Sequence, residues 1–416
     1  MLDMFTIATV WLALAVLSTI LANRLKISMA LMEICVGAAA GYAAARFLDP
    51  DILRPNADWL KFVAGSGAVL LTFLAGMELD PASLREKSRE ISLVGTIGFF
   101  APFLGCAAIA HYLLGWDTRA SLLAGVALAA TSMAVIYSVM IEYGFNKTSY
   151  GKGIIGASFV NDIGSVIALS LIFAPLDHRM LVFALASAAA FLVLPRVTRR
   201  LIRIYGYGTA AIRTKWVLFI VFGMGALALW AGSEAVLPAY IAGMVLSATI
   251  KKDELFVRRL RTLTIGFLTP FYFLRAGALV SLPAVAAAPG VFLALLAGKI
   301  ISKVFCLYPV IGIFKESARE RWYYTLLMST GLTFGTISAL YGLTHGIVTA
   351  EQYSLLVAVI IGSAVIPTLV ANAAFLPEHL LEAPVADEEM AQMETISAEG
   401  PGLDIEAYLK GPASER

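Results

Sequence analysis

The chain has 416 residues, of which 59% are hydrophobic and only 14% are charged, a composition that excludes an ordinary soluble globular protein. The formal net charge is +2, and because most of the charged residues lie in loops between apolar runs, this small excess indicates no nucleic-acid partner. The three cysteines, Cys35, Cys106 and Cys306, lie far apart inside apolar segments, which favours packing residues over a disulfide or a metal site.

Apolar runs follow one another along the chain, and runs of about 18–25 residues are long enough to cross roughly 30 Å of hydrocarbon. We therefore predict an all-α polytopic membrane protein with thirteen transmembrane helices. The predicted helices cover residues 4–23, 29–47, 61–79, 91–114, 119–141, 152–174, 180–196, 215–232, 236–250, 263–282, 288–312, 321–343 and 352–376.

Basic residues are concentrated in alternate loops of this predicted arrangement. The loops after odd-numbered helices hold most of the Lys and Arg, with a dense group at residues 196–215. Because cytoplasmic loops carry the excess of Lys and Arg, we expect the N-terminus outside and the C-terminus in the cytoplasm. The expected location is the inner (plasma) membrane of the cell, with the lipid bilayer as a partner.

The composition changes after residue 376. We therefore divide the chain into a transmembrane transport domain at 1–376 and an acidic cytoplasmic tail at 377–416, which holds ten acidic and two basic residues. Such a tail is typical of a solvated, partly disordered segment; a regulatory segment that docks on the basic loops is the alternative. The sequence has no GxxxxGK[ST] and no strand-associated GxGxxG, so neither an ATP-driven pump nor a bound cofactor is expected.

A single acid, Asp162, lies midway along the predicted helix 152–174, directly after Asn161. A carboxylate at the bilayer centre costs about 3 kcal/mol on insertion scales, so such acids are functional candidates. A group that binds either a proton or a desolvated monovalent cation is the minimum for exchange of the two. Ser158 lies one turn earlier on the same helical face and can supply an oxygen ligand. The alternative is a structural acid paired with an intramembrane Lys or Arg.

Two predicted helices carry small and hydroxyl residues at bilayer depth: ATSMAVIYS in 119–141 and STGLTFGTIS in 321–343. Such patches either let helices pack closely or mark discontinuous helices whose half-helix ends flank a transport site. Because the two patches are seven helices apart, we favour inverted repeats with two crossing discontinuous helices. Thr131 and Ser132 of the first patch can offer hydroxyl or carbonyl oxygens to an ion.

Further charged residues are predicted inside the membrane. Lys299 lies at the middle of the eleventh helix and is expected to meet Asp162 and its neighbour, as a counter-charge or as a proton carrier. Lys303, one turn nearer the cytoplasm, can snorkel toward the interface. Arg275 keeps its proton and is interpreted as a member of a structural ion pair. Glu78, near the inner end of the third helix, is expected to line a cytoplasmic funnel.

Four segments resemble, in order, the monovalent cation:proton antiporters of the sodium/proton exchanger superfamily, and most closely its NapA-like and Kef-type branch. They are RLKISMALMEICVGAAAGY, LLTFLAGMELDP, ALAATSMAVIYSVMIEYG and GKGIIGASFVNDIGSVIALSL. The resemblance covers residues 1 to about 376. It implies thirteen helices, a six-helix core domain, a dimerisation domain, hence a homodimer, and elevator-like alternating access. It also implies that Asp162 binds the ion or the proton, with Thr131 and Ser158 near a bound Na⁺ and Lys299 as the core lysine.

Two departures from the family pattern bear on mechanism. Electrogenic members carry two adjacent acids, whereas the first residue of the pair is Asn161 here. In the family, an Asn-Asp pair accompanies electroneutral exchange. A lysine such as Lys299, however, is more typical of the two-acid branch. In addition, STGLTFGTIS lacks an Arg-Gly often found in this helix, so Arg275 is a candidate to carry that charge from another helix.

The predicted function is secondary antiport of Na⁺ or Li⁺, with K⁺ a further candidate, against protons by alternating access, with Asp162 binding the cation and the proton competitively. The alternatives are a Kef-like potassium-efflux component and a Na⁺-coupled organic-anion transporter of a related fold. No nucleophile and base are paired at membrane depth, so an enzyme is not expected.

Overall fold

The structure is a computed structural model that describes residues 4–25, 27–47, 52–78, 87–145, 148–173, 178–205, 211–233, 235–250 and 253–380. Over these residues the chain is helical and contains no β-strand, which confirms the predicted all-α fold. The acidic segment from residue 381 and the side chain of Glu78 lie outside the described residues.

The helices follow the apolar runs of the sequence. The first half of the chain forms α1 (Met4–Leu25), α2 (Met29–Phe47), α3 (Asp58–Glu78), α5 (Ser88–Ala108), η2 (Ile109–Leu113), α6 (Thr118–Ala129), α7 (Met133–Glu142), α8 (Ser149–Phe173) and α9 (His178–Tyr205). The second half forms α10 (Ile212–Trp230), α11 (Val236–Ile250), α12 (Glu254–Leu263), η4 (Thr264–Leu268), α13 (Thr269–Ala278), α14 (Leu282–Ala287), α15 (Pro289–Ile311), α16 (Ala318–Met328), α17 (Thr333–Thr344), α18 (Ala350–Ala374) and η5 (Glu378–Leu380).

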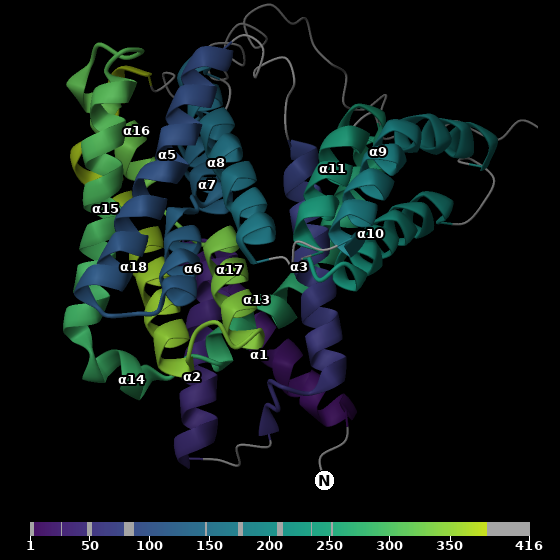
Figure 1. The fold of residues 1–416 in the computed structure, drawn as a ribbon, viewed down its shortest axis with the longest axis horizontal. Coiled ribbons are helices and arrows are strands. Elements are labelled where there is room, and N and C mark those ends of the chain that lie inside the picture. Colours follow the sequence, from purple (N-terminus) through teal and green to yellow (C-terminus); the bar gives the residue numbers. More distant parts are fainter. Residues whose placement is uncertain are drawn as a thin grey trace, which may run out of the picture.

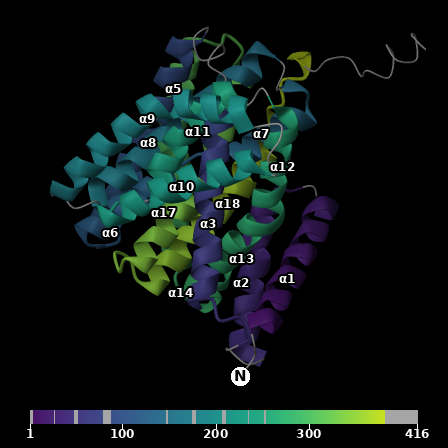
Figure 2. The ribbon, with the colours of Figure 1, turned by 90° about the vertical axis from the view of Figure 1, so that its right-hand side faces the viewer.

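The helices form two groups that pack side by side (Figure 1). In the scaffold group, α2 lies against α13 and α3 against α11, and α1 packs on α2 at one side of the molecule (Figure 2). In the second group, here called the core group, α5 packs on α6, α8 and α15, while α17 packs on α6 and α18. The groups meet where α11 lies against α8, because the ring of Tyr240 stacks on Phe159 with 5.3 Å between the ring centroids.

Among the described residues, ten helical stretches are long and apolar enough to cross a membrane, with α16 and α17 counted as one stretch. Two shorter apolar helices, α6 and α11, accompany them. The predicted helix 119–141 falls on α6 and α7, and the predicted helix 263–282 falls mostly on η4 and α13. The polytopic helical fold is therefore confirmed, whereas the number of thirteen spans stays a prediction.

Glycines allow the scaffold helices to approach closely. A Cβ atom on Gly37 would overlap a backbone carbonyl of α13, and one on Gly277 would overlap a carbonyl of α2. The same reciprocal arrangement joins α3 and α11 at Gly76 and Gly243. Small residues at helix crossings are how helices associate in a bilayer, where the apolar solvent provides no hydrophobic driving force.

Replacing Gly277 by Ala is expected to lower the stability of the purified protein, because the added methyl group must push α2 away from α13. Overpacking of this kind costs about 1–3 kcal/mol, and we expect a lower melting temperature in detergent. The matched control is Gly266→Ala in η4, where a Cβ atom meets no atom within 4 Å. Equal melting temperatures for the two variants would contradict this account of the crossing.

Candidate ion-binding site

Asp162 lies within α8 and is 1% exposed, and the preceding Asn161 is fully buried. No described group donates a hydrogen bond to the Oδ1 atom of Asp162. A buried acceptor without a donor is costly, so this oxygen is suited to bind a proton or a cation. The oxygen of the Asn161 side chain has a structural partner, because its Oδ1 accepts a hydrogen bond from the backbone N–H of Thr131 at 2.9 Å, whereas no described group accepts a hydrogen bond from its Nδ2.

The first interrupted helix is formed by α6 and α7. The helix ends at Ala129, the backbone at Ala130 is extended, with ψ of 140°, and α7 begins at Met133. Ser132 caps the new helix, because its Oγ accepts a hydrogen bond from the N–H of Val135 at 3.3 Å. The interruption falls on the hydroxyl-rich patch, which confirms that this patch breaks a helix.

The second interrupted helix is formed by α16 and α17, which stop at Met328 and resume at Thr333. The two interruptions touch: the Oγ1 of Thr131 donates a hydrogen bond to the carbonyl of Met328 at 3.1 Å. Ser158 of α8 reaches the same residue, since its Oγ lies 3.3 Å from the Met328 sulfur. In Figure 1, α6 lies beside α17 at one end of the core group while α16 lies at the other, so the two interrupted helices run in opposite directions.

Lys303 of α15 lies between the two interruptions. Its Nζ donates hydrogen bonds to the Oγ1 of Thr131, at 2.8 Å, and to the carbonyl of Met328. The side chain is fully buried, so the prediction that it snorkels toward the interface is wrong. The physical reason is the break at Met328, because the last carbonyls of a helix lack intrahelical partners and attract an ammonium group inside the protein.

Lys299 lies one turn away and binds different groups. Its Nζ donates to the carbonyl of Ala130 at 3.4 Å and to the Oγ of Ser363 at 3.0 Å. It packs against the bare Cα of Gly331, where a Cβ atom would overlap the amino group. Its described hydrogen bonds therefore go to the first break and to α18, rather than to Asp162 and its neighbour as expected.

The two lysines therefore occupy the C-terminal ends of two half-helices. Lys299 binds the carbonyl at the end of α6, and Lys303 binds the last carbonyl of α16. Helix C-termini carry partial negative charge, and a cation there contributes up to about 2 kcal/mol in a partly buried site. When both amino groups are protonated, the two lysines carry more positive charge than the carboxylate of Asp162 can neutralise in the described part of this site.

The other two predicted supporting charges are Arg275 and Glu78. Arg275 is 5% exposed, and instead of an ion pair its Nε donates to the carbonyl of Pro55 at 2.6 Å. In the part of the chain that the structure describes, Arg275 forms no hydrogen bond with a residue of the predicted ion site. Glu78 ends α3, but its side chain lies outside the described residues.

Sequence reasoning did not place three contributors at this site: Lys303, which was expected to snorkel, Met328 and Ser363. Only Lys303 had a usable signal, since it lies four residues after Lys299 and therefore on the same face of α15. Met328 acts through its backbone carbonyl, which no side-chain pattern reveals. The described residues contain no cluster of three or more His, Cys, Asp or Glu that could hold a metal ion, so a bound cation would depend on hydroxyl and carbonyl oxygens beside one carboxylate.

The sequence matches a known protein family and several curated relatives. The family model "Sodium/hydrogen exchanger, transmembrane" matches residues 12–374. Probable Na(+)/H(+) antiporter 3 from Methanocaldococcus jannaschii is 28% identical over 227 residues, which cover 52% of this chain and 58% of that protein. The glutathione-regulated potassium-efflux system protein KefC from Enterobacter sp. is 26% identical over 349 residues, which cover 79% of this chain and 54% of that protein. The chain thus spans little more than half the length of these two relatives.

A solved structure shares the fold. The structure of the sodium proton antiporter MjNhaP1 from Methanocaldococcus jannaschii matches with a TM-score of 0.66 at 15% identity, over 90% of this chain and 97% of that one. At this identity the match shows the fold alone, and the family model carries the assignment. By its sequence over residues 12–374, the chain belongs to the sodium/hydrogen exchanger family.

Proposed function

We propose that the protein is a secondary antiporter that exchanges a monovalent cation, Na⁺ or Li⁺ with K⁺ as a further candidate, for protons by alternating access. The observation that carries the proposal is the buried carboxylate of Asp162, whose Oδ1 has no described donor and which lies beside two interrupted helices. An acid at such a junction is how secondary transporters bind ions at membrane depth. Family membership supports the same reading.

Four oxygen-bearing residues are the proposed cation ligands. Asp162 supplies the charge, while the hydroxyls of Thr131 and Ser158 and the carbonyl of Met328 lie around the junction. Hard monovalent cations prefer such oxygen ligands. Asn161 holds the first break in place through the N–H of Thr131, and Ser132 caps α7. Protonation of Asp162 removes its charge, so protons and cations compete for the site.

The lysines give a second reason for coupling. Lys303 already donates to Thr131 and to Met328, so its ammonium group occupies oxygens that a cation would need. A further positive ion beside the Lys303 ammonium group is costly in a low-dielectric interior. Cation entry should therefore expel a proton from this cluster, which links the two fluxes.

The setting of the protein is part of the proposal. The excess of Lys and Arg in alternate loops supports an outside N-terminus and a cytoplasmic C-terminus in the plasma membrane. We further infer a homodimer and elevator-like movement of the core group against the scaffold group, as the family resemblance implies. The acidic tail after residue 376 would then be cytoplasmic.

The test is cation-driven dissipation of a pH gradient in proteoliposomes, followed with a pH-sensitive dye. Addition of Na⁺, Li⁺ or K⁺ should produce a signal that vesicles without protein lack, and the three ions rank the selectivity. Because Asn161 replaces the first acid of the electrogenic members, we expect the rate to be unchanged when the membrane potential is clamped at different values. A rate that follows the potential would contradict electroneutral exchange, and no signal with any ion would contradict antiport.

A potassium-efflux role is the second candidate, because the similarity to KefC extends over 79% of this chain. It predicts K⁺ flux without an equivalent proton flux. Potassium currents far above the turnover of a carrier, in a planar bilayer, would favour it.

A further inference from the structure

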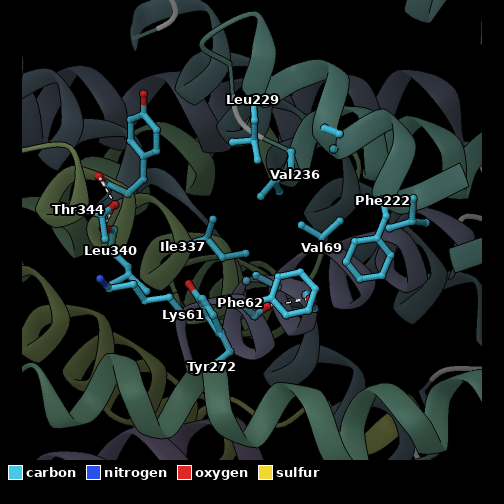
Figure 3. Close-up of a pocket in the computed structure, with 18 of the residues that line it drawn as sticks. Lys61, Phe62, Val69, Phe222, Leu229, Val236, Tyr272, Ile337, Leu340 and Thr344 are labelled. Carbon is cyan, nitrogen blue, oxygen red and sulfur yellow. Dashed lines mark hydrogen bonds between the residues drawn. The ribbon is translucent and has the colours of Figure 1, made fainter. Parts of the chain in front are cut away.

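A cavity of about 450 Å³ lies between the two helix groups. It is bounded by α3, α13 and the start of α11 of the scaffold group, by α10, which packs on α11 and α3, and by α17 of the core group. Figure 3 shows Phe62 and Tyr272 at one edge of the opening, with Leu229 and Val236 opposite and Ile337 of α17 beside them. The cavity lies apart from the candidate ion site, since neither Asp162 nor its oxygen-bearing neighbours are among the residues that line it.

The charges in this cavity are unsuited to a cation. Its described lining is mainly apolar and contains two basic side chains, Lys61 and Arg275, and no acidic one. The amino group of Lys61 lies 3.3 Å from Asp58, but that carboxylate is fully exposed outside the lining, and an exposed pair of this kind contributes little. The lining also includes the hydroxyl residues Ser66, Tyr272, Tyr341 and Thr344. With two bases and no acid among the described lining residues, however, its fixed charge attracts an anion rather than a cation.

Exposed aromatic side chains lie at one edge of the cavity. Phe62 of α3 and Phe222 of α10 stack at its rim with 6.0 Å between ring centroids, and both side chains are exposed, at 67% and 39%. Both helices belong to the apolar stretches long enough to span the bilayer. In a bilayer these exposed rings would face the lipid chains, and their displacement would let an apolar chain reach the cavity.

We propose that this cavity binds a long-chain carboxylate, the anion of a membrane fatty acid. Its head group would lie at Lys61 and Arg275, and its chain would extend along Val69, Phe222 and Leu229. The volume is within the range of about 300–1,000 Å³ that is usual for small-molecule sites, and such sites combine apolar walls with a few polar groups that orient the ligand. An arginine frequently binds a carboxylate through two parallel N–H···O hydrogen bonds.

The binding test uses the full-length protein in phosphatidylcholine nanodiscs and a dodecylsulfonate that carries a diazirine at the far end of its chain. A sulfonate stays ionised, so unlike a fatty acid the probe cannot carry protons across a membrane. We expect photolabelling of cavity-facing peptides of α3, α10 and α17, and competition by unlabelled laurate. The matching dodecyltrimethylammonium probe should leave these peptides unlabelled.

Matched glycine variants test the location. Gly65 lines the cavity, and a Cβ atom there meets nothing within 4 Å, so Gly65→Leu fills the space without disturbing the helices. We expect it to reduce labelling by at least about fivefold, as loss of a shaped apolar pocket should. Gly223→Leu on α10 is the control, because Gly223 is equally unobstructed but lies outside the cavity lining.

Two results would overturn the proposal. Labelling that persists in Gly65→Leu at the native level would place the probe elsewhere, and equal labelling by the ammonium probe would reveal an unspecific apolar crevice. Lys61→Gln should weaken labelling by the sulfonate while the melting temperature stays unchanged; unaltered labelling would remove the lysine from the site.

A second readout rests on the proposed antiport. A chain in this cavity contacts α17 and the scaffold helices at once, so it should oppose their relative movement and slow exchange in the native protein but not in Gly65→Leu. The two proposals fail separately: absence of exchange with any cation contradicts antiport, whereas the labelling pattern alone decides whether the cavity binds a lipid anion.

Discussion

Replacing Asp162 by Asn is expected to abolish cation-driven proton exchange while the protein still folds. The amide has nearly the same shape but carries no charge, so the site can no longer neutralise a desolvated cation or take up a proton. Loss of roughly 3 kcal/mol of cation binding corresponds to about a hundredfold in affinity. The measurement is the pH-gradient assay in proteoliposomes, with the melting temperature of the purified variant recorded in parallel.

Asp117→Asn is the matched control for this substitution. Asp117 caps α6 by accepting hydrogen bonds from the N–H groups of Arg119 and Ala120, and Asn is an equally good N-cap residue. The same chemical change at the end of a core helix should therefore leave exchange intact. Retained turnover in the folded Asp162 variant would contradict the proposed role of the carboxylate.

The native protein should bind the cation more weakly at lower pH. Protonation converts the Asp162 carboxylate into a neutral acid, so a lower pH should raise the apparent KM for the cation. Raising the cation concentration at constant pH should restore the rate, because the two ligands compete for one group. A KM that is independent of pH while the maximum rate falls would instead indicate a regulatory proton outside the site.

The sequence was sufficient to locate the carboxylate and both breaks. The hydroxyl- and glycine-rich patches mark positions where a helix interior lacks good helix formers, and the structure interrupts a helix at Thr131 and again near Gly331. An acid in an apolar run stands out because its burial is so unfavourable. These signals are local in the chain, which is why they could be read without a structure.

The partners of the lysines could not be read in this way. Lys303 is held by a hydroxyl 172 positions away and by a backbone carbonyl, and such partners depend on how α15 docks on both breaks. Arg275 likewise donates to the carbonyl of Pro55, 220 positions away, where an ion pair was expected. Main-chain carbonyls have no residue signature, so contacts to them emerge only from the packed fold.

Replacing Lys303 by Met is expected to change both the affinity for the cation and the rate of exchange. Methionine keeps the length of the side chain but removes the ammonium group, which frees the Thr131 hydroxyl and the Met328 carbonyl for a cation. We therefore expect the apparent KM for the cation to fall by about threefold to tenfold, equivalent to roughly 0.7–1.4 kcal/mol. We also expect a shallower dependence of KM on pH, because one competing proton carrier has been lost.

The maximum rate of the Lys303 variant should fall by at least about tenfold. The C-terminus of α16 loses its cation, although the Met328 carbonyl keeps the hydrogen bond from Thr131. The Oγ1 of Thr131 loses the donor that Lys303 supplied, and a buried acceptor left without a donor costs about 1–3 kcal/mol, so the arrangement of the two breaks becomes less well defined. Lys299→Met is the matched control, since Lys299 binds Ala130 and Ser363 instead of the proposed cation ligands. It should lower the melting temperature with little change in KM. If Lys303→Met shows the same KM as the native protein, Lys303 is a packing residue, and coupling depends on Asp162 alone.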